Sequence, residues 1–128
     1  MKRILIVEDD TDIVALLALR LKTAGFEVHT ALDGLNGVKL AVQHKPDLIL
    51  MDIWMPIGMG FSVAERLKAL ELGNIPVVYM TASKSKTLRK RAKQLGGAAF
   101  IEKPYTFEQL LEVIAKVLPP DANTKQAA

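Results

Sequence analysis

Five short apolar runs recur along the chain, separated by segments in which apolar residues return every three or four positions. The runs cover residues 3–7, 27–31, 48–51, 76–80 and 98–101. The first, third and fourth runs are almost continuously apolar, which is typical of strands covered on both faces in a parallel sheet. We therefore predict five strands, three of them with helices on both sides.

The intervening segments have the apolar spacing of amphipathic helices. They cover residues 13–24, 35–44, 61–72, 87–95 and 107–118. Gly25, Gly73 and Gly96 follow three of these segments and are expected to end the helices. Thr106 and Gln109 have the spacing of a capping box, which predicts the start of the last helix. Five strand–helix repeats predict an α/β fold, a doubly wound parallel sheet of (βα)5 type.

The length of 128 residues fits a single domain, and half of the residues are hydrophobic. We expect this domain to span residues 1–118. The last ten residues, 119–128, are small and polar, which indicates a flexible tail or linker stub. The absence of cysteine excludes a disulfide framework or a thiolate metal site. Because no signal peptide or membrane-length apolar run occurs, the expected location is the cytoplasm.

The net charge of +3 is distributed unevenly. Residues 84–93 contain six of the 17 basic residues and no acidic residue, so the rest of the chain has 11 basic and 14 acidic residues, a net charge of −3. The pI of about 9.2 therefore arises from one segment. A high pI of this origin does not by itself imply nucleic-acid binding, and we expect no direct binding to nucleic acid. The basic segment is either a solvated helix face or a contact surface for an acidic protein or a nucleic acid.

Acidic residues follow two of the predicted strands directly. Glu8, Asp9 and Asp10 come after the first strand, and Asp52 ends the third. Since the carboxyl ends of parallel strands share one edge of a sheet, these side chains are expected to lie together. A group of carboxylates suits a hard divalent cation such as Mg²⁺ or Mn²⁺. Asp10 is instead expected to cap the following helix.

The same edge offers groups suited to phosphoryl chemistry. Thr81 ends the fourth strand and Lys103 follows the fifth. The Asp52 carboxylate is able to attack phosphorus and form an aspartyl phosphate. A metal ion and Lys103 would neutralise the phosphoryl oxygens, while the Thr81 hydroxyl would donate a hydrogen bond to a third oxygen.

The segments "ILIVEDD", "PDLILMDIWMP", "VVYMTA" and "IEKPY", in this order and spacing, resemble the receiver domain of bacterial response regulators. The resemblance extends from Lys2 to Leu118. It implies a flavodoxin-like sheet in the order 2-1-3-4-5 and a signalling switch in a two-component system or phosphorelay. Asp52 would accept a phosphoryl group from a sensor histidine kinase or a histidine phosphotransfer protein.

The resemblance also implies a role for each residue of the site. Glu8, Asp9 and Asp52 would bind Mg²⁺ together with the backbone carbonyl of Trp54. Trp54 is large for a position beside the phosphoryl group, and we predict that it shields the acyl phosphate from water.

Other residues would bind the phosphoryl group and transmit the signal. Thr81 and Lys103 would contact the group itself. Thr81 would then move, and Phe100 would rotate inward. This change would alter the partner surface formed by the fourth helix, fifth strand and fifth helix, for an unknown output protein or for a homodimer formed on phosphorylation.

Three other classes of function compete with this interpretation. A haloacid-dehalogenase-type phosphatase also uses an Asp nucleophile and Mg²⁺, but it requires a second Asp at the place of Trp54. A flavodoxin-like carrier requires a phosphate cradle after the first strand, where three acids stand here. A constitutive binding module would not require an intact acidic site. We therefore expect no enzyme activity beyond Mg²⁺-dependent self-phosphorylation and slow autodephosphorylation.

Overall fold

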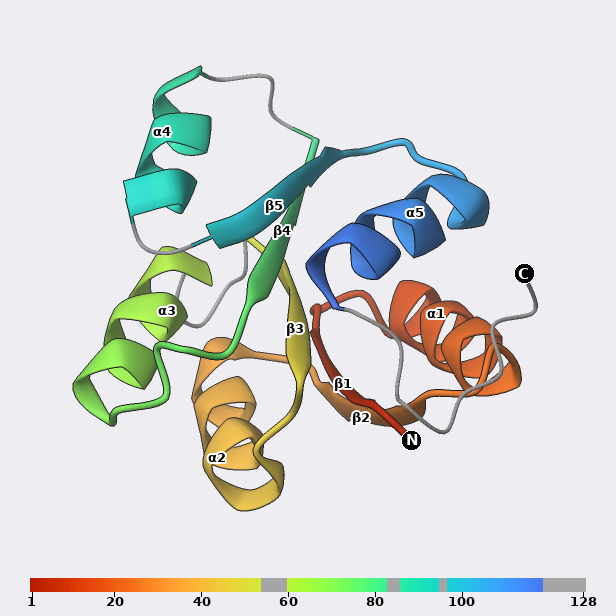
Figure 1. Ribbon diagram of the computed structural model, residues 1–128, viewed down its shortest axis with the longest axis horizontal. Coiled ribbons are helices and arrows are strands. Elements are labelled where there is room, and N and C mark those ends of the chain that lie inside the picture. The colour runs from red at the N-terminus through yellow and green to blue at the C-terminus, as the bar shows by residue number, and fades with distance from the viewer. Residues whose placement is uncertain (54–59, 83–85, 95–96, 119–128) are drawn as a thin grey trace.

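The computed structural model describes residues 1–53, 60–82, 86–94 and 97–118, in which strands and helices alternate (Figure 1). The strands are β1 (Arg3–Val7), β2 (Glu27–Ala31), β3 (Leu48–Asp52), β4 (Val77–Thr81) and β5 (Gly97–Glu102). The helices are α1 (Thr11–Thr23), α2 (Gly34–His44), α3 (Gly60–Ala69), α4 (Lys86–Gln94) and α5 (Phe107–Val117). Each predicted strand and helix is present, although the predicted end of the fourth helix at Gly96 lies outside the described residues. None of the helices in these ranges is both long and apolar enough to cross a lipid bilayer.

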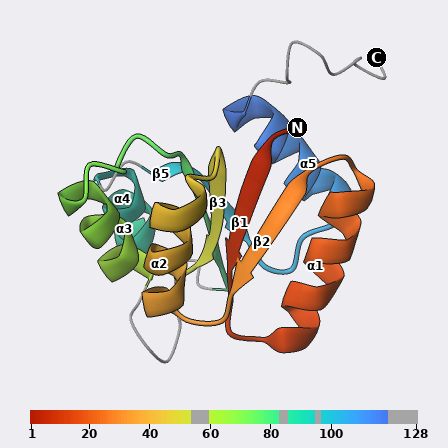
Figure 2. The same ribbon diagram turned by 90° about the horizontal axis from the view of Figure 1, so that it is seen from below.

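All neighbouring strands run parallel in one sheet with the order β2-β1-β3-β4-β5. This is the order that the resemblance implied. It places β1 beside β3, where successive connections pass to opposite sides of the sheet. Helices α1 and α5 cover one face, and α2, α3 and α4 cover the other (Figure 2). The doubly wound architecture is therefore confirmed.

Two apolar layers hold these helices to the sheet, because successive side chains of a strand point to opposite faces. The layer beneath α1 and α5 includes Ile4, Ile6, Leu17, Leu21, Leu110 and Ile114. The layer beneath α2, α3 and α4 includes Leu5, Val7, Ala41, Ile49, Leu67 and Tyr79. All residues of β3 and β4 are buried. Continuous apolar runs thus correspond to strands covered on both faces, as predicted.

Two helix ends show how backbone conformation stops a helix. After α1, Gly25 has a φ of 102°, and the amides of Gly25 and Phe26 donate to carbonyls of the last helical turn. The predicted end at Gly25 is therefore correct. Helix α3 was predicted to continue to residue 72, but it ends at Ala69 because Glu71 adopts a left-handed φ of 63°. Gly73 does not end this helix; a Cβ there would lie 3.2 Å from the Lys68 Cα.

Side-chain caps begin α1 and α5 where the sequence placed them. The Asp10 carboxylate accepts hydrogen bonds from the amides of Asp12 and Ile13, at 3.0 and 3.2 Å. The Thr106 hydroxyl accepts from the Gln109 amide, and the Gln109 side chain accepts from the Thr106 amide, which completes the capping box. Each cap satisfies amides that have no carbonyl partner within the helix.

We expect Gly97→Ala to destabilise the protein by about 1–3 kcal/mol, the usual cost of overpacking. A Cβ at this position would lie 2.6 Å from the Ala92 carbonyl oxygen and 2.9 Å from the Tyr79 ring. Chemical denaturation measures the change in unfolding free energy. The exposed neighbour Ala98 provides the control, since Ala98→Val should change stability little. Equal stability of Gly97→Ala and the wild type would contradict this packing.

Alkaline pH is expected to weaken the fold through Tyr79. Burial raises the pKa of its phenol to about 12 from the ordinary 10.0. A raised pKa favours the folded state below pH 10, and this contribution is lost as pH rises through the folded-state pKa. The loss should reach ~2–3 kcal/mol. Urea unfolding over this pH range should show a smaller alkaline decrease for Tyr79→Phe than for the wild type; parallel curves would contradict the assignment.

Candidate functional site

Backbone hydrogen bonds of the sheet continue just beyond the carboxyl ends of β1 and β5, and these bonds position the candidate residues. The Glu8 amide donates to the Ala31 carbonyl at 3.0 Å, and the Lys103 amide donates to the Thr81 carbonyl at 2.8 Å. Asp52 is the last residue of β3, and Thr81 is the last of β4. The structure therefore brings these side chains to the same carboxyl-terminal edge, as the sequence predicted.

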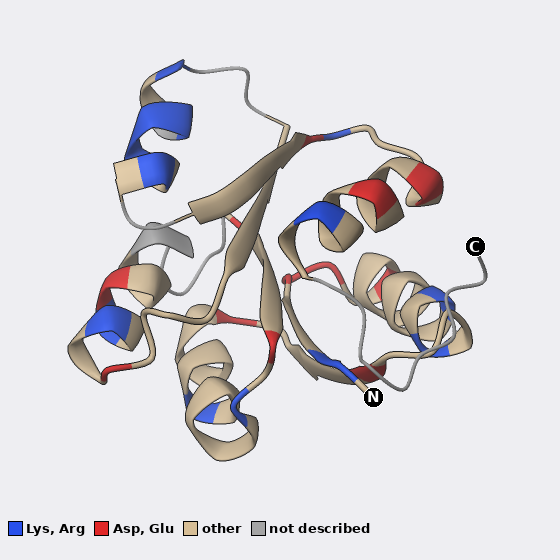
Figure 3. Cartoon of the chain, in the orientation of Figure 1, with Lys and Arg blue, Asp and Glu red and all other residues tan. Residues whose placement is uncertain are grey.

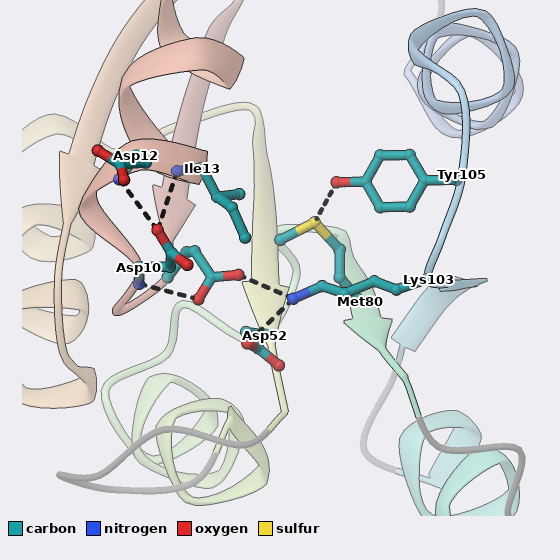
Figure 4. A network of polar contacts seen from close by, with 8 residues as sticks. Asp10, Asp12, Ile13, Asp52, Met80, Lys103 and Tyr105 are labelled. Carbon is teal, nitrogen blue, oxygen red and sulfur yellow. Dashed lines mark hydrogen bonds and ion pairs between the residues drawn. The ribbon is translucent and has the colours of Figure 1, made fainter.

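Lys103 lies at the centre of the acidic group (Figure 4). Its Nζ donates to Glu8 Oε1 at 2.9 Å and to Asp52 Oδ2 at 3.3 Å. The other carboxylate oxygen of Glu8 accepts from the Asp10 amide at 3.2 Å. Glu8 is only 1% exposed and Asp52 only 7%. Because burying a carboxylate is costly without a partner, the lysine offsets part of the cost of burying both carboxylates.

The pKa shifts at the site follow from these contacts. Burial disfavours the Lys103 ammonium, but the hydrogen bond to Glu8 and the negative charges of Asp52 and Glu8 outweigh it and raise the pKa of Lys103. The pKa of Asp9 is also raised, chiefly by a hydrogen bond with the Glu8 side chain and then by burial and neighbouring negative charge. The site therefore holds more negative charge than its own lysine neutralises.

Three carboxylates can hold a metal ion together. Glu8, Asp9 and Asp52 each offer one oxygen, and these oxygens lie within 4.8 Å of one another. Glu8 and Asp52 are buried, whereas Asp9 is exposed, which leaves one side open to solvent. Hard divalent cations prefer such carboxylate oxygens, supplemented by water. Trp54, whose carbonyl was predicted as a further ligand, lies outside the described residues.

The proposed switch residues lie on adjacent strands. In the β4–β5 register, Tyr79 pairs with Phe100 and Thr81 with Glu102. Thr81 and Phe100 therefore point to the same face of the sheet. Thr81 is fully buried and Phe100 is half-buried. The Arg89 guanidinium of α4 lies 5.1 Å from the Phe100 ring centroid and forms an ion pair with Glu102.

The family described as the response regulator receiver domain matches residues 4–115 of this sequence. The chain belongs to this family. Its matched segment contains Asp52, Thr81 and Lys103, together with the acidic residues after β1. The resemblance inferred from four short motifs is thereby confirmed over almost the whole folded part of the receiver domain.

Three similar proteins illustrate the range of receiver domains that this chain resembles. The transcriptional regulator RpaA of Synechocystis is 36% identical over 129 residues, covering all of this chain and 54% of RpaA. The chain thus spans about half the length of the first curated relatives that it matches. The chemotaxis protein CheY4 of Vibrio cholerae is 28% identical with a TM-score of 0.88, over 92% of this chain and 99% of CheY4. The receiver domain of the histidine kinase PA1611 of Pseudomonas aeruginosa, solved with magnesium in its active-site cleft, is 27% identical with a TM-score of 0.82, over 91% of this chain and 96% of that one.

Tyr105 is a neighbour of the site that sequence reasoning did not single out. Its hydroxyl donates to the Met80 Sδ at 3.3 Å (Figure 4), and burial raises the pKa of this phenol. The contact holds the loop after β5 against β4, two residues beyond Lys103. The peptide bond between Lys103 and Pro104 is cis. The aromatic residue directly after Lys-Pro in "IEKPY" was the available sequence signal.

Magnesium is expected to raise the thermal stability of this receiver domain. A ligand that binds only the folded state stabilises it by about 1.4 kcal/mol at ten times its Kd, enough to raise Tm by several degrees. Asp9→Asn should reduce this Mg²⁺-dependent rise, because it removes one of the three carboxylates. Glu112→Gln, an exposed change on α5, should not. Calorimetry with and without Mg²⁺ measures both; an undiminished rise in Asp9→Asn would exclude Asp9 as a ligand.

Proposed function

We propose that this receiver domain is a phosphorylation-controlled signalling switch in which Asp52 accepts a phosphoryl group. The donor is the phosphohistidine of a sensor histidine kinase or a histidine phosphotransfer protein. The observation that carries the proposal is the position of the Asp52 carboxylate, 3.3 Å from the Lys103 amine and within the Glu8–Asp9 cluster. The magnesium in the related PA1611 domain supports Mg²⁺, or Mn²⁺, as the ion for this cluster.

The chemistry follows from the positions of these side chains. An Asp52 carboxylate oxygen attacks phosphorus, the new P–O bond forms as the P–N bond of phosphohistidine breaks, and the imidazole keeps the electron pair of that bond. Lys103 stabilises negative charge on the phosphoryl oxygens, and the Thr81 hydroxyl donates to one of them. When bound, the divalent ion neutralises further phosphoryl charge. Beyond this reaction, the activity is limited to slow hydrolysis of the acyl phosphate.

The response to phosphorylation involves Thr81 and Phe100. Their shared face and adjacent strands allow a movement of Thr81 to change the space available to Phe100. The surface of α4, β5 and α5 then differs between the two states. Its partner is an output protein or, on phosphorylation, a second copy of the chain. We propose that residues 1–118 form this receiver domain and that 119–128 are a tail or linker stub.

A small phosphodonor tests the function without knowledge of the kinase. Incubation with acetyl phosphate and Mg²⁺ should produce an acyl phosphate that hydroxylamine removes, and peptide mapping should locate it at Asp52. Omission of the divalent ion, or its removal with EDTA, should prevent the labelling. A stable label on another residue, or labelling that is indifferent to divalent ions, would refute the proposal.

A further inference from the structure

Helix α4 carries a charge that the phosphorylation chemistry does not use. It contains five basic residues and no acidic residue (Figure 3). Two of these are neutralised within the protein, since Arg89 pairs with Glu102 of β5 and Arg91 pairs with Glu65 of α3. The other three, Lys86, Lys90 and Lys93, are exposed and have no hydrogen-bonding or ion-pair partner among the described residues.

These three lysines form a stripe on one face of α4. Their spacing of i, i+4 and i+7 places them on neighbouring turns, within a length of about 10 Å. We refer to Lys86, Lys90 and Lys93 as the lysine stripe. Three ammonium groups at this separation repel one another in the isolated domain. An anionic partner with matching spacing would remove this repulsion.

A groove of about 420 Å³ lies between α4 and α5 over β5, and α4 contributes Arg89, the residue before Lys90, to its lining. Its lining residues include Arg89, Phe100, Tyr105, Val113 and two acids, Glu102 and Glu112. The apolar part offers a place for a nonpolar side chain. The acids make this neighbouring wall unfavourable for a polyanion.

The charges discriminate between kinds of anionic partner. Double-stranded DNA presents about one charge per 1.7 Å, so its backbone would extend beyond a stripe of about 10 Å. Beyond the stripe it would meet Glu112 and a chain whose net charge, without residues 84–93, is −3. A short polypeptide avoids both problems, because it can place carboxylates only where the lysines stand.

We propose that α4 docks an acidic helical segment of a protein partner. Carboxylates at i, i+4 and i+7 of that segment face the lysine stripe, and a neighbouring apolar side chain enters the groove beside Phe100. The proposal depends on the proposed function only in regarding this face as the output surface. It adds the chemical class of the partner, which the family assignment leaves open.

Two synthetic helical peptides of identical composition test the proposal. One has Glu at i, i+4 and i+7 with an adjacent Leu, and the other has the same residues in scrambled order. Binding is measured by fluorescence anisotropy, with a random-sequence DNA duplex and anionic phosphatidylserine vesicles as competing probes. The matched peptide should bind at least about tenfold more tightly than the scrambled one.

Two charge-reversed proteins locate the binding site. Replacement of the lysine stripe by glutamate should weaken binding of the matched peptide by about tenfold or more. The control carries the same change in net charge at the exposed residues Lys22, Lys39 and Lys68 and should bind within about twofold of the wild type. A further variant, in which the three lysines of the stripe are replaced by glutamine, repeats the test by removing the positive charge without reversing it.

Equal binding of the two peptides, or equal losses in the stripe and control variants, would overturn the proposal. Tighter stripe-dependent binding of the duplex or the vesicles would replace it with a nucleic-acid or membrane contact. Labelling of Asp52 by acetyl phosphate, measured in the same variants, separates the two proposals. Intact labelling without peptide binding would refute only the proposed docking site. Peptide binding without labelling would refute only the proposed phosphorylation switch.

Discussion

Asp52→Asn is expected to abolish formation of the hydroxylamine-sensitive acyl phosphate. Asparagine keeps the shape of the side chain, but its amide is not a nucleophile towards phosphorus. The substitution also removes one of the two carboxylates that contact Lys103. Labelling with acetyl phosphate and Mg²⁺, followed by mass spectrometry of the intact protein, measures the loss.

A matched control separates this loss from a general effect of removing an acid. Asp47→Asn also removes one Asp charge, but Asp47 caps the Arg3 amide near the start of β1, away from the site. This variant should label at the rate of the wild type. Retained labelling of Asp52→Asn at a wild-type rate would show that another residue is the acceptor.

Lys103→Ala should slow labelling of Asp52 by about 10²–10³-fold, the usual effect of losing one preorganised charge-stabilising donor. The Lys103 ammonium already lies 3.3 Å from an Asp52 oxygen, so it can follow the charge that develops on the transferred group. The substitution also leaves the buried Glu8 carboxylate without its cationic partner. Without metal, stability should fall by about 1–3 kcal/mol.

The two effects of Lys103→Ala can be measured independently. The rate of acetyl phosphate labelling reports the chemical role, and urea unfolding in EDTA reports the structural one. Lys116→Ala, an exposed change on α5, should alter neither. A labelling rate within about twofold of the wild type, in a folded Lys103→Ala protein, would exclude a direct role for the ammonium.

Sequence patterning was sufficient to predict the order and type of the elements. Continuous apolar runs such as 48–51 indicate strands that are covered on both faces, and capping residues such as Thr106 indicate where helices begin. The predicted end of α3 was wrong, because Glu71 and not Gly73 adopts the left-handed conformation. Glu71 is exposed, and the Leu72 amide closes the helix end by donating to the Leu67 carbonyl at 2.8 Å. Glycine is the usual residue in this left-handed position, so the sequence pointed to Gly73 instead.

The candidate site could be predicted because a parallel sheet brings strand ends together. Topology brings Glu8 and Lys103 to the same end of the sheet, although 95 positions separate them, and the long Lys103 side chain completes the contact across β3 and β4. Contacts between side chains on different elements could not be predicted from the sequence in this way. The ring of His29 stacks on that of His44 at 3.8 Å, and Arg89 lies over Phe100, but no periodic pattern relates either pair. Such contacts depend on rotamers and on how the helices are placed on the sheet.

The described contacts of α4 are more polar than those of α1, and this has a mechanical consequence. Helix α1 contributes Val14, Leu17 and Leu21 to the buried layer, whereas Ala92 is the buried residue of α4 among those whose side chains are described. Ion pairs from Arg89 and Arg91 join the described side chains of α4 to β5 and α3. A displacement of α4 along the sheet would therefore break and remake charge contacts that are already partly solvated, and such contacts are weak. The described contacts of α4 thus favour small shifts of this helix on the sheet.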